Sequence, residues 1–376
     1  MSGDQRPAPL VLMGAPAADE APFGSYAAGL ATGRHLLAAE LSQRLARQGA
    51  AVQLIPPAVE AGPFHWGSWY SRAARAALDE AGDRVDALGW VGAGALAMLG
   101  DEALDALLSP IAGEVVTNNR FSSDAFVVAG DLSAALGVLA GLGADNGAPR
   151  ALEAAGFTVR DLSDAPWTRF DVDTPLDLAL LRLATRIAGT RTLDPAIVAF
   201  LEGAQLPGSR SLEIPRLEDL LAVLRNRNAE LVVAGRVPSS AFAYLEEQAA
   251  CRVRLFVEER GMRAAPGHRP RSLLADWVTE HGGASLMEHL ATLGDAVIID
   301  TRVVMASLAG SSDTAAWPSP EERYASDFGD PSPIATPWLR DLTTAAASAS
   351  VPFLLGAHTL VSDGLRILTD AAWLGR

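Results

Sequence analysis

The stretch TRFDVDTPLDLALL, residues 168–181, places two aspartates between a short strand-like run and a helix. Asp171 and Asp173 flank one valine, so in an extended chain they point to the same face. Thr174 and Pro175 then open a helix whose apolar residues recur at helical spacing. Asp173 or Thr174 as N-cap, with proline in the first turn, accounts for half of the motif. Capping does not account for Asp171, because a carboxylate at a strand end is costly unless metal, arginine or solvent balances it.

Short β-rich runs alternate with helical stretches along the whole chain. The predicted strands are 9–14, 51–56, 85–92, 113–118, 125–130, 230–235, 251–257, 296–300 and 351–356. Helices are predicted from about Arg34, Ser68, Asp101 and Asp131, and a Ser/Pro/Gly-rich loop over 310–333. The pattern predicts an α/β protein with a mostly parallel sheet. We expect a first domain at 1–190, a helical linker region at 191–228 and a second, smaller α/β domain at 229–376.

The composition of the 376 residues restricts the chemistry. With 49% hydrophobic and 20% charged residues the chain can bury a large core. A formal net charge of -15 disfavours nucleic acid and anionic membrane as partners. All 30 basic residues are arginines, which excludes Schiff-base chemistry and a P-loop lysine. Any phosphate must therefore be held by arginine, backbone amides or metal.

The sequence also bears on redox chemistry and location. Cys251 is the only cysteine, so an intramolecular disulfide and a cysteine-built zinc site are excluded. The opening MSGDQRPAPL lacks the basic-then-apolar pattern of a signal peptide, and the longest apolar stretch is interrupted by Asp131. We therefore expect a cytoplasmic protein. Nothing in the sequence indicates its oligomeric state.

Polar residues follow the predicted strands of the first domain, where functional groups of α/β sheets gather. These positions are Gly14, Gly92–Gly94, TNNRFSSD at 117–124, ADNG at 144–147 and the DVDTP motif. The loop at 117–124 is equally compatible with side-chain-to-backbone turns. Packing under a loop is the expected fate of the aromatic residues in FHWGSWY, 64–70, although His65 is a candidate to face the cleft.

Taken together, the DVDTP-then-helix ending, the preceding ALEAAGFTVRDL and the strand end NNRFSSDAFVV resemble a family. They are similar to nucleotidyltransferases of the molybdenum-cofactor guanylyltransferase and phospholactate guanylyltransferase type. Those enzymes share a nucleotide-diphospho-sugar transferase fold, and the resemblance covers residues 9–188. It implies transfer of a nucleotidyl group from a nucleoside triphosphate to a small phosphorylated or hydroxylated acceptor, with Mg²⁺ neutralising the leaving pyrophosphate.

The resemblance also assigns roles to residues of the first domain. Gly14 fits the strand-end glycine of the family, and Arg34, after "TG", takes the place of its phosphate-binding lysine. Asp171 and Asp173 would be the catalytic and metal-holding residues. The other candidate nucleotide- or acceptor-binding residues are His65, Asn118, Asn119, Asp124, Asp145 and Asn146.

Two signatures of that family are missing. There is no lysine, and no acid lies between Asp86 and Asp101, where the family has a metal-binding aspartate at the end of its third strand. Ligands for Mg²⁺ must then come from Asp171, Asp173, Asp124 or Asp145, together with substrate phosphate. These departures keep open a degenerate scaffold that binds a nucleotide or metabolite without catalysis.

The second domain resembles no family that we can name. Its strand ends read AGRVPSS at 234–240, EERGMR at 258–263, DTR at 300–302 and LGAHTLVSDG at 355–364, which a parallel sheet brings to one edge. The candidate anion-binding residues at this edge are Arg236, Arg263, Asp300, Arg302 and His358. One alternative is a structural network in which Asp300, Glu258 and Glu259 pair with the arginines. Another is phosphate-ester chemistry around Asp300 and His358.

Overall fold

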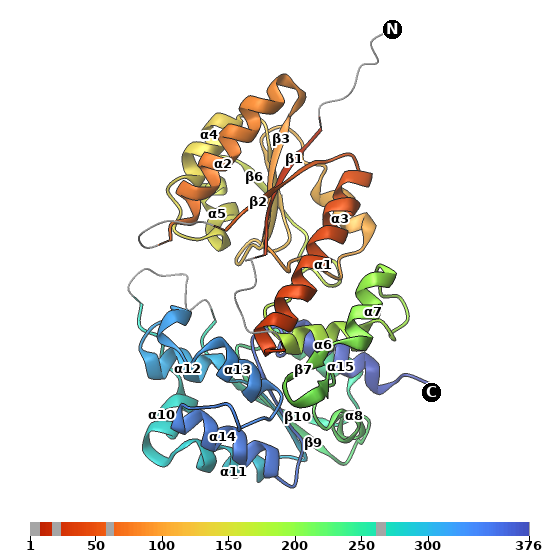
Figure 1. Cartoon of the computed structure of the whole chain (residues 1–376), viewed down its shortest axis with the longest axis vertical. Coiled ribbons are helices and arrows are strands. Elements are labelled where there is room, and N and C mark those ends of the chain that lie inside the picture. Colours follow the sequence, from red (N-terminus) through yellow and green to blue (C-terminus); the bar gives the residue numbers. More distant parts are fainter. Residues whose placement is uncertain (1–7, 17–23, 58–63, 261–267, 376) are drawn as a thin grey trace. The chain divides into compact units, whose positions relative to one another are not determined.

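A computed structural model of the chain describes residues 8–16, 24–57, 64–260 and 268–375 (Figure 1). The chain forms two compact units, each built on its own sheet. The first unit holds Arg34–Asp171 and the amino-terminal strand, and the second holds Val172–Arg376 and the residues just before Arg34. The boundary therefore falls inside the DVDTP motif rather than near residue 190, because the helix after Pro175 packs within the second unit.

The first unit contains a six-stranded sheet in the order β2-β1-β3-β5-β4-β6. Its strands are β1 (Leu10–Gly14), β2 (Ala51–Ile55), β3 (Ala87–Val91), β4 (Glu114–Thr117), β5 (Ala125–Ala129) and β6 (Thr158–Asp161). Neighbours run parallel, except that β5 is antiparallel to β3 and β4. The apolar pattern correctly predicted the first five strands. It missed β6, since no residue of this edge strand is fully buried and only one side chain is apolar.

Helices cover both faces of this sheet (Figure 1). The carboxyl-terminal part of α1 (Tyr26–Arg47) and α3 (Asp101–Leu107) lie on one face, where Met13, Leu45 and Leu104 share an apolar core. On the other face Trp66 and Phe126 belong to a second core. The helices that lie there are α2 (Trp66–Ala81), α4 (Leu132–Leu139) and α5 (Ala148–Ala154), with short 3-10 turns η1 (Gly82–Arg84) and η2 (Asp145–Gly147) beside them. Burial on both faces explains why β3 and β5 read as continuous apolar runs.

The second unit contains a four-stranded, fully parallel sheet in the order β10-β9-β11-β12. Its strands, β9 (Glu230–Gly235), β10 (Arg252–Val257), β11 (Ala296–Asp300) and β12 (Phe353–Gly356), all lie within predicted runs. This sheet is the smaller of the two. The unit is nevertheless the longer, because it also includes the first turns of α1 and the segment from Val172 that we expected to be divided between the first domain and a linker.

The second unit carries helices between and around its strands. On one face, α10 (Leu273–His281), α11 (Gly283–Ala291), α12 (Arg302–Ala309) and α14 (Pro337–Ser348) share an apolar core with the sheet. Elsewhere α15 (Asp363–Ala372) packs against α6 (Pro175–Ala184), α8 (Leu217–Leu224) and α9 (Ser239–Gln248). The remaining elements are α7 (Pro195–Gly203), a small hairpin of β7 (Gln205–Leu206) and β8 (Arg210–Ser211) with its turn η3 (Pro207–Ser209), the turn η4 (Thr314–Ala316) and α13 (Pro320–Asp327).

The predicted loop at 310–333 was wrong in one respect, because it contains α13. Ser319 and Glu322 form a capping box in which each side chain accepts a hydrogen bond from the other's backbone N–H. The sequence Ser-Pro-Glu-Glu is therefore a helix-start signal inside a composition typical of loops. Among all the described residues, no helix combines the length and the apolar character needed to cross a membrane.

Candidate functional site

The carboxyl ends of β1, β3, β4 and β6 lie at one edge of the first sheet, together with the amino end of β5. The chain passes from β1 to β2 on one side, whereas from β3 it continues to the strands on the other side. The connections that leave the carboxyl ends of the paired strands β1 and β3 therefore run in opposite directions. Ligands of open α/β sheets bind at such a point. Gly14 ends β1, and a Cβ there would lie 3.0 Å from a ring carbon of Trp90. Glycine is therefore required by the indole packed beside it.

Asp124 and Asp171 flank one turn, Gly92–Ala95, directly after β3. The Gly92 N–H donates to the backbone oxygen of Asp124 at 2.8 Å, and Ala95 forms an isolated antiparallel bridge with Asp171. The Ala95 N–H closes the turn on the Gly92 oxygen at 3.2 Å. This turn holds the backbones of both aspartates at the carboxyl edge of the sheet.

The polar loops at 117–124 and 144–147 are joined. Asn146 Nδ2 donates to Ser122 Oγ at 3.2 Å, and its backbone oxygen accepts from the Ser123 N–H at 3.2 Å. Beside it, Asp145 Oδ2 accepts from Trp90 Nε1 at 3.0 Å. The structure thus brings Asp124, Asp145 and Asn146 to the same edge, as the sequence predicts for strand ends.

Asn118 and Asn119 do not read a sugar or acceptor in this arrangement. Asn118 is 2% exposed, and its Oδ1 accepts from the Asp124 and Ala125 N–H groups at 3.1 and 3.0 Å. Its Nδ2 donates to the Thr168 oxygen at 2.9 Å and lies 3.5 Å from Asp124 Oδ2. Asn119 Oδ1 accepts from the Phe121 N–H at 3.1 Å inside the loop. The polar-turn alternative therefore describes these two amides, and Asn118 positions Asp124.

Arg34 and His65 also differ from their expected roles. The helix α1 begins at Tyr26, so Arg34 lies in its interior and not at its start. The preceding Gly33 is a packing residue, since a Cβ there would lie 2.7 Å from a methyl carbon of Leu178. His65 is the N-cap of α2, where its Nδ1 accepts from the Ser68 N–H at 3.3 Å. The histidine side chain thus stabilises a helix start.

The DVDTP motif is resolved into a capping box. Thr174 is the N-cap of α6: its Oγ1 accepts from the Asp177 N–H at 3.3 Å, and Asp177 Oδ2 accepts from the Thr174 N–H at 2.7 Å. The Asp173 N–H also donates to Asp177 Oδ2, at 3.0 Å. Burial, and then the charge of Asp173, raise the pKa of Asp177 to about 7. The sequence missed this buried acid because it reads as an ordinary third helix residue.

Metal binding by Asp171 with Asp173 stays a prediction. Asp171 belongs to the first unit and Asp173 to the second. Within the part of the chain that the structure describes, no three histidine, cysteine, aspartate or glutamate side chains are grouped to hold a metal ion.

The strand ends of the second unit meet at one edge, because all four strands are parallel. Arg236, directly after β9, forms a two-point ion pair with Asp300 at the end of β11, with Nε–Oδ2 at 2.6 Å and Nη2–Oδ1 at 3.1 Å. Burial alone would raise the pKa of the fully buried Asp300, but the Arg236 guanidinium holds it below its usual range. His358, after β12, acts on Asp300 in the same direction. Asp300 is therefore an ionised carboxylate, and both of its oxygens bind Arg236.

Arg302 is paired just as fully. Its Nη1 and Nη2 donate to the two oxygens of Asp327 at 2.7 and 2.6 Å, and Nη1 also donates to Thr301 Oγ1 at 2.9 Å. Burial disfavours its charge, but Asp327 raises the pKa of Arg302 above the ordinary value. The expectation that Arg302 offers an uncompensated charge to an anion is thereby corrected. Asp327 was missed as its partner because it ends the unpredicted helix α13.

The acids after β10 have other partners. Glu258 Oε1 accepts from Ser272 Oγ at 2.9 Å and from the Leu274 N–H at 3.2 Å, at the start of α10. Glu259 lies 2.8 Å from His268 Nε2. Neither acid pairs with Arg236 or Arg302. Arg263, the remaining candidate, lies outside the described residues.

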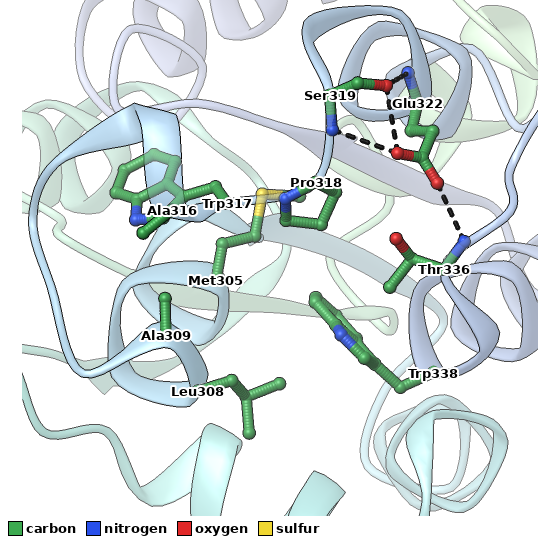
Figure 2. A pocket seen from close by; sticks show the side chains of 10 residues that line it. All are labelled: Met305, Leu308, Ala309, Ala316, Trp317, Pro318, Ser319, Glu322, Thr336 and Trp338. Carbon is green, nitrogen blue, oxygen red and sulfur yellow. Dashed lines mark hydrogen bonds between the residues drawn. The ribbon is translucent and has the colours of Figure 1, made fainter.

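A cavity of about 380 Å³ lies on the second unit between α12 and the starts of α13 and α14. Figure 2 shows Trp317, Trp338 and Met305 around it, with Glu322 at its rim. Glu322 accepts hydrogen bonds from the Ser319 and Thr336 N–H groups at 2.9 and 2.7 Å, which lower its pKa to about 2 against the opposing effect of burial. Its carboxylate thus serves two helix starts, and Ser319 and Thr336 line the cavity together with apolar side chains.

Comparison with known proteins gives one likeness worth stating. No family model matches the chain, and no curated protein matches it. A solved structure from Desulfovibrio desulfuricans G20, described as a nucleotide-diphospho-sugar transferase, is 15% identical with a TM-score of 0.39. The match covers 52% of this chain and 94% of that one. A likeness at this level adds nothing to the geometry of the two sheet edges.

Proposed function

We propose that the first unit binds a nucleoside triphosphate at the carboxyl ends of β1 and β3. It would transfer the nucleotidyl group to a small phosphorylated or hydroxylated acceptor. The observation that carries the proposal is the attachment of Asp124 and Asp171 to the turn Gly92–Ala95 at this edge. Because the chain has no lysine, backbone amides and a metal ion are the natural partners of the phosphates.

The donor set at this edge suits Mg²⁺, since carboxylate oxygens together with substrate phosphate are its usual ligands. Asp124 and Asp171 would hold the ion, which would neutralise charge on the departing pyrophosphate. In the transfer an acceptor oxygen bonds to the α-phosphorus as the bond from that phosphorus to the bridging oxygen breaks. A phosphate acceptor attacks through an ionised oxygen, and a hydroxyl acceptor releases its proton to water. Asn118 keeps Asp124 in position throughout.

A second candidate function is nucleotide binding without transfer. It is favoured by the segment after β3, which carries no acid between Asp86 and Asp101. Both candidates require nucleotide binding, so the release of pyrophosphate separates them.

The test is calorimetric titration of the whole chain with each of the four common nucleoside triphosphates, with and without Mg²⁺. In thermal unfolding of the same samples, a nucleotide at about a hundred times its dissociation constant should raise the free energy of unfolding by ~2.7 kcal/mol. Asp171→Asn should weaken Mg²⁺-dependent binding and leave the fold intact. The matched control is Asp131→Asn at the opposite end of β5, where the side chain accepts from the Ala134 N–H at 2.9 Å and asparagine caps equally well.

Each outcome decides a separate point. No binding of any triphosphate would remove both candidates. Equal losses of affinity in Asp171→Asn and Asp131→Asn would show that Asp171 acts through stability alone. Binding without pyrophosphate release, in the presence of phosphorylated and hydroxylated acceptors, would leave the second candidate.

A further inference from the structure

Arg236 lies where the strand order of the second sheet reverses. The chain passes from β9 to β10 on one side, whereas from β11 it continues to β12 on the other side. The connections that leave the carboxyl ends of the paired strands β9 and β11 therefore run in opposite directions. Arg236 directly follows β9, and Asp300 is the last residue of β11. Their ion pair therefore spans the point at which sheets of this kind bind ligands.

The ion pair leaves one edge of the guanidinium available. Arg236 uses Nε and Nη2 to bind Asp300, and among the described residues Nη1 has no hydrogen-bond partner. The guanidinium is planar, so Nη1 points away from the carboxylate that holds the other two nitrogens. The Asp300 side chain is 0% exposed and that of Arg236 is 19% exposed. A buried carboxylate thus fixes a guanidinium whose remaining donor reaches the surface.

The backbone is shaped for this arrangement. Gly235 has a φ of +124°, and a Cβ there would lie 2.4 Å from the Cβ of Asp300. The residue before Arg236 must therefore be glycine for the strand ends to come this close. His358, after β12, contributes to lowering the pKa of Asp300.

Arg302 gives an internal contrast. Both of its terminal nitrogens bind Asp327, and the residue is 5% exposed. Arg236 is instead held side-on, with a terminal nitrogen turned outward.

We propose that the outer edge of Arg236 binds the phosphoryl group of a small phosphorylated metabolite at the carboxyl ends of β9 and β11. Arginine N–H groups form short, charge-assisted bonds with phosphate oxygens. The exposed Ser239 lies three residues further on, at the start of α9, and adds a hydroxyl donor to the same edge. A phosphoryl group, with three terminal oxygens, can use donors from the guanidinium and the hydroxyl together, whereas a carboxylate has two oxygens. This site is in a different unit from the proposed nucleotide site.

The experiment is calorimetric titration of the whole chain with inorganic phosphate, at constant ionic strength set with chloride. Arg236→Gln removes the outer donor, and Arg236→Lys keeps a charge for Asp300 without the planar fork. Both should lower phosphate affinity by about tenfold or more, the loss of one hydrogen bond to a charged group. The control, Arg302→Lys, changes the arginine that has no outward donor and should keep the affinity of the parent. Acetate is the second probe and should bind more weakly than phosphate.

The named outcomes either support or overturn the site. If Arg236→Gln fails to fold by circular dichroism, Arg236→Lys carries the test alone. Absence of phosphate binding by the parent, or retained binding in Arg236→Lys, overturns the proposal. Acetate binding as tight as phosphate overturns the phosphoryl assignment. Titration of the same variants with triphosphate and Mg²⁺ keeps the two proposals apart, because Arg236 variants should leave nucleotide affinity unchanged.

Discussion

The two sheet edges hold their polar residues in different ways. At the edge of the first sheet, neutral side chains bind two of the aspartates: the Asn118 Oδ1 accepts from the Asp124 N–H, and Trp90 donates to Asp145. At the edge of the second sheet, charges position one another: Arg236 holds Asp300, and Arg302 holds Asp327. Amide and indole donors leave a carboxylate its negative charge, whereas a guanidinium fork neutralises it.

The difference bears on which ligands each edge suits. Under the proposed function, carboxylates at the edge of the first sheet bind the cation of a metal–nucleotide complex. Carboxylates consumed by arginine cannot, so in the second unit the outward arginine edge is the group left for an anion. The two proposed sites both lie at strand ends, but one would bind a cation with its nucleotide and the other an anion.

The largest expected loss of stability follows from removing one charge at the edge of the second sheet. Arg302→Met leaves Asp327 buried without its partner and should lower the free energy of unfolding by ~3–5 kcal/mol, measured by urea denaturation. The double variant Arg302→Met with Asp327→Leu should recover most of this loss, since both charges of the pair are then removed. A single variant that costs under ~1 kcal/mol would contradict a desolvated pair.

The neutral edge should break at a smaller cost. Asn118→Ala leaves the Ala125 N–H and the Thr168 oxygen without their partner, and we expect a loss of ~2–3 kcal/mol in the free energy of unfolding. It should also weaken triphosphate binding through Asp124. Asn146→Ala, which loses a bond to the exposed Ser122, is the control and should stay within ~0.5 kcal/mol of the parent. Equal losses in the two variants would show that Asn118 has no special positioning role.

The sequence predicted the sheets well for a physical reason. Strands such as 230–235 and 296–300 are buried on both faces, so they read as apolar runs that end in glycine or acid. The misses have reasons too. Edge strand β6 buries little, and α13 begins with a capping box inside a Ser/Pro-rich stretch. Apolar patterning therefore predicts strands that are buried on both faces. It misses an edge strand with little burial and a helix whose start is set by local capping.

The candidate sites were predicted by place and not by partner. Asp300 is the last residue of β11 and Asp124 directly precedes β5, so both lie at sheet edges, whereas Asp145 lies in η2 and reaches the edge through its bond with Trp90. The partner of Arg302 lies 25 residues away in sequence, and pairing over such a distance is set by tertiary packing. His65 and Asn118 illustrate the other limit, because a polar side chain that satisfies backbone groups looks the same in sequence as one that awaits a ligand.

The third prediction concerns how a buried acid, Asp177, makes the free energy of unfolding depend on pH. The folded-state pKa of Asp177 is about 7, above its ordinary value of 3.8, so the folded state binds the proton more tightly. The free energy of unfolding should then fall as the pH rises from about 4 to about 7, by on the order of 1 kcal/mol per pH unit. Asp177→Asn should flatten this slope in urea denaturation at a series of pH values.

The opposite sign at Asp300 provides the check. Its pKa is lowered by Arg236 beyond the opposing effect of burial, so its contribution is present at neutral pH and is lost only as the pH falls below the usual carboxyl range. Measurements above about pH 5 therefore separate Asp177 from Asp300, and measurements above about pH 6 also separate it from Asp327, whose pKa burial raises to about 6. An unchanged slope in Asp177→Asn would show that other groups cause the dependence.

The smallest effect concerns the motif at the boundary of the two units. Thr174→Ala removes the hydroxyl that caps α6 and should cost ~1 kcal/mol by urea denaturation at about pH 7. Asp173→Asn should stay within ~0.5 kcal/mol of the parent, because Asp173 reaches the capping box through its backbone N–H, which asparagine retains, and its charge disfavours ionised Asp177. Thr174→Ser keeps the hydroxyl and should behave like the parent. A loss in Asp173→Asn as large as that in Thr174→Ala would move the cap to Asp173. If Asp173→Asn leaves stability unchanged but weakens Mg²⁺-dependent nucleotide binding, Asp173 joins Asp171 as a metal ligand, and the paired acids of the motif have a task that capping does not explain.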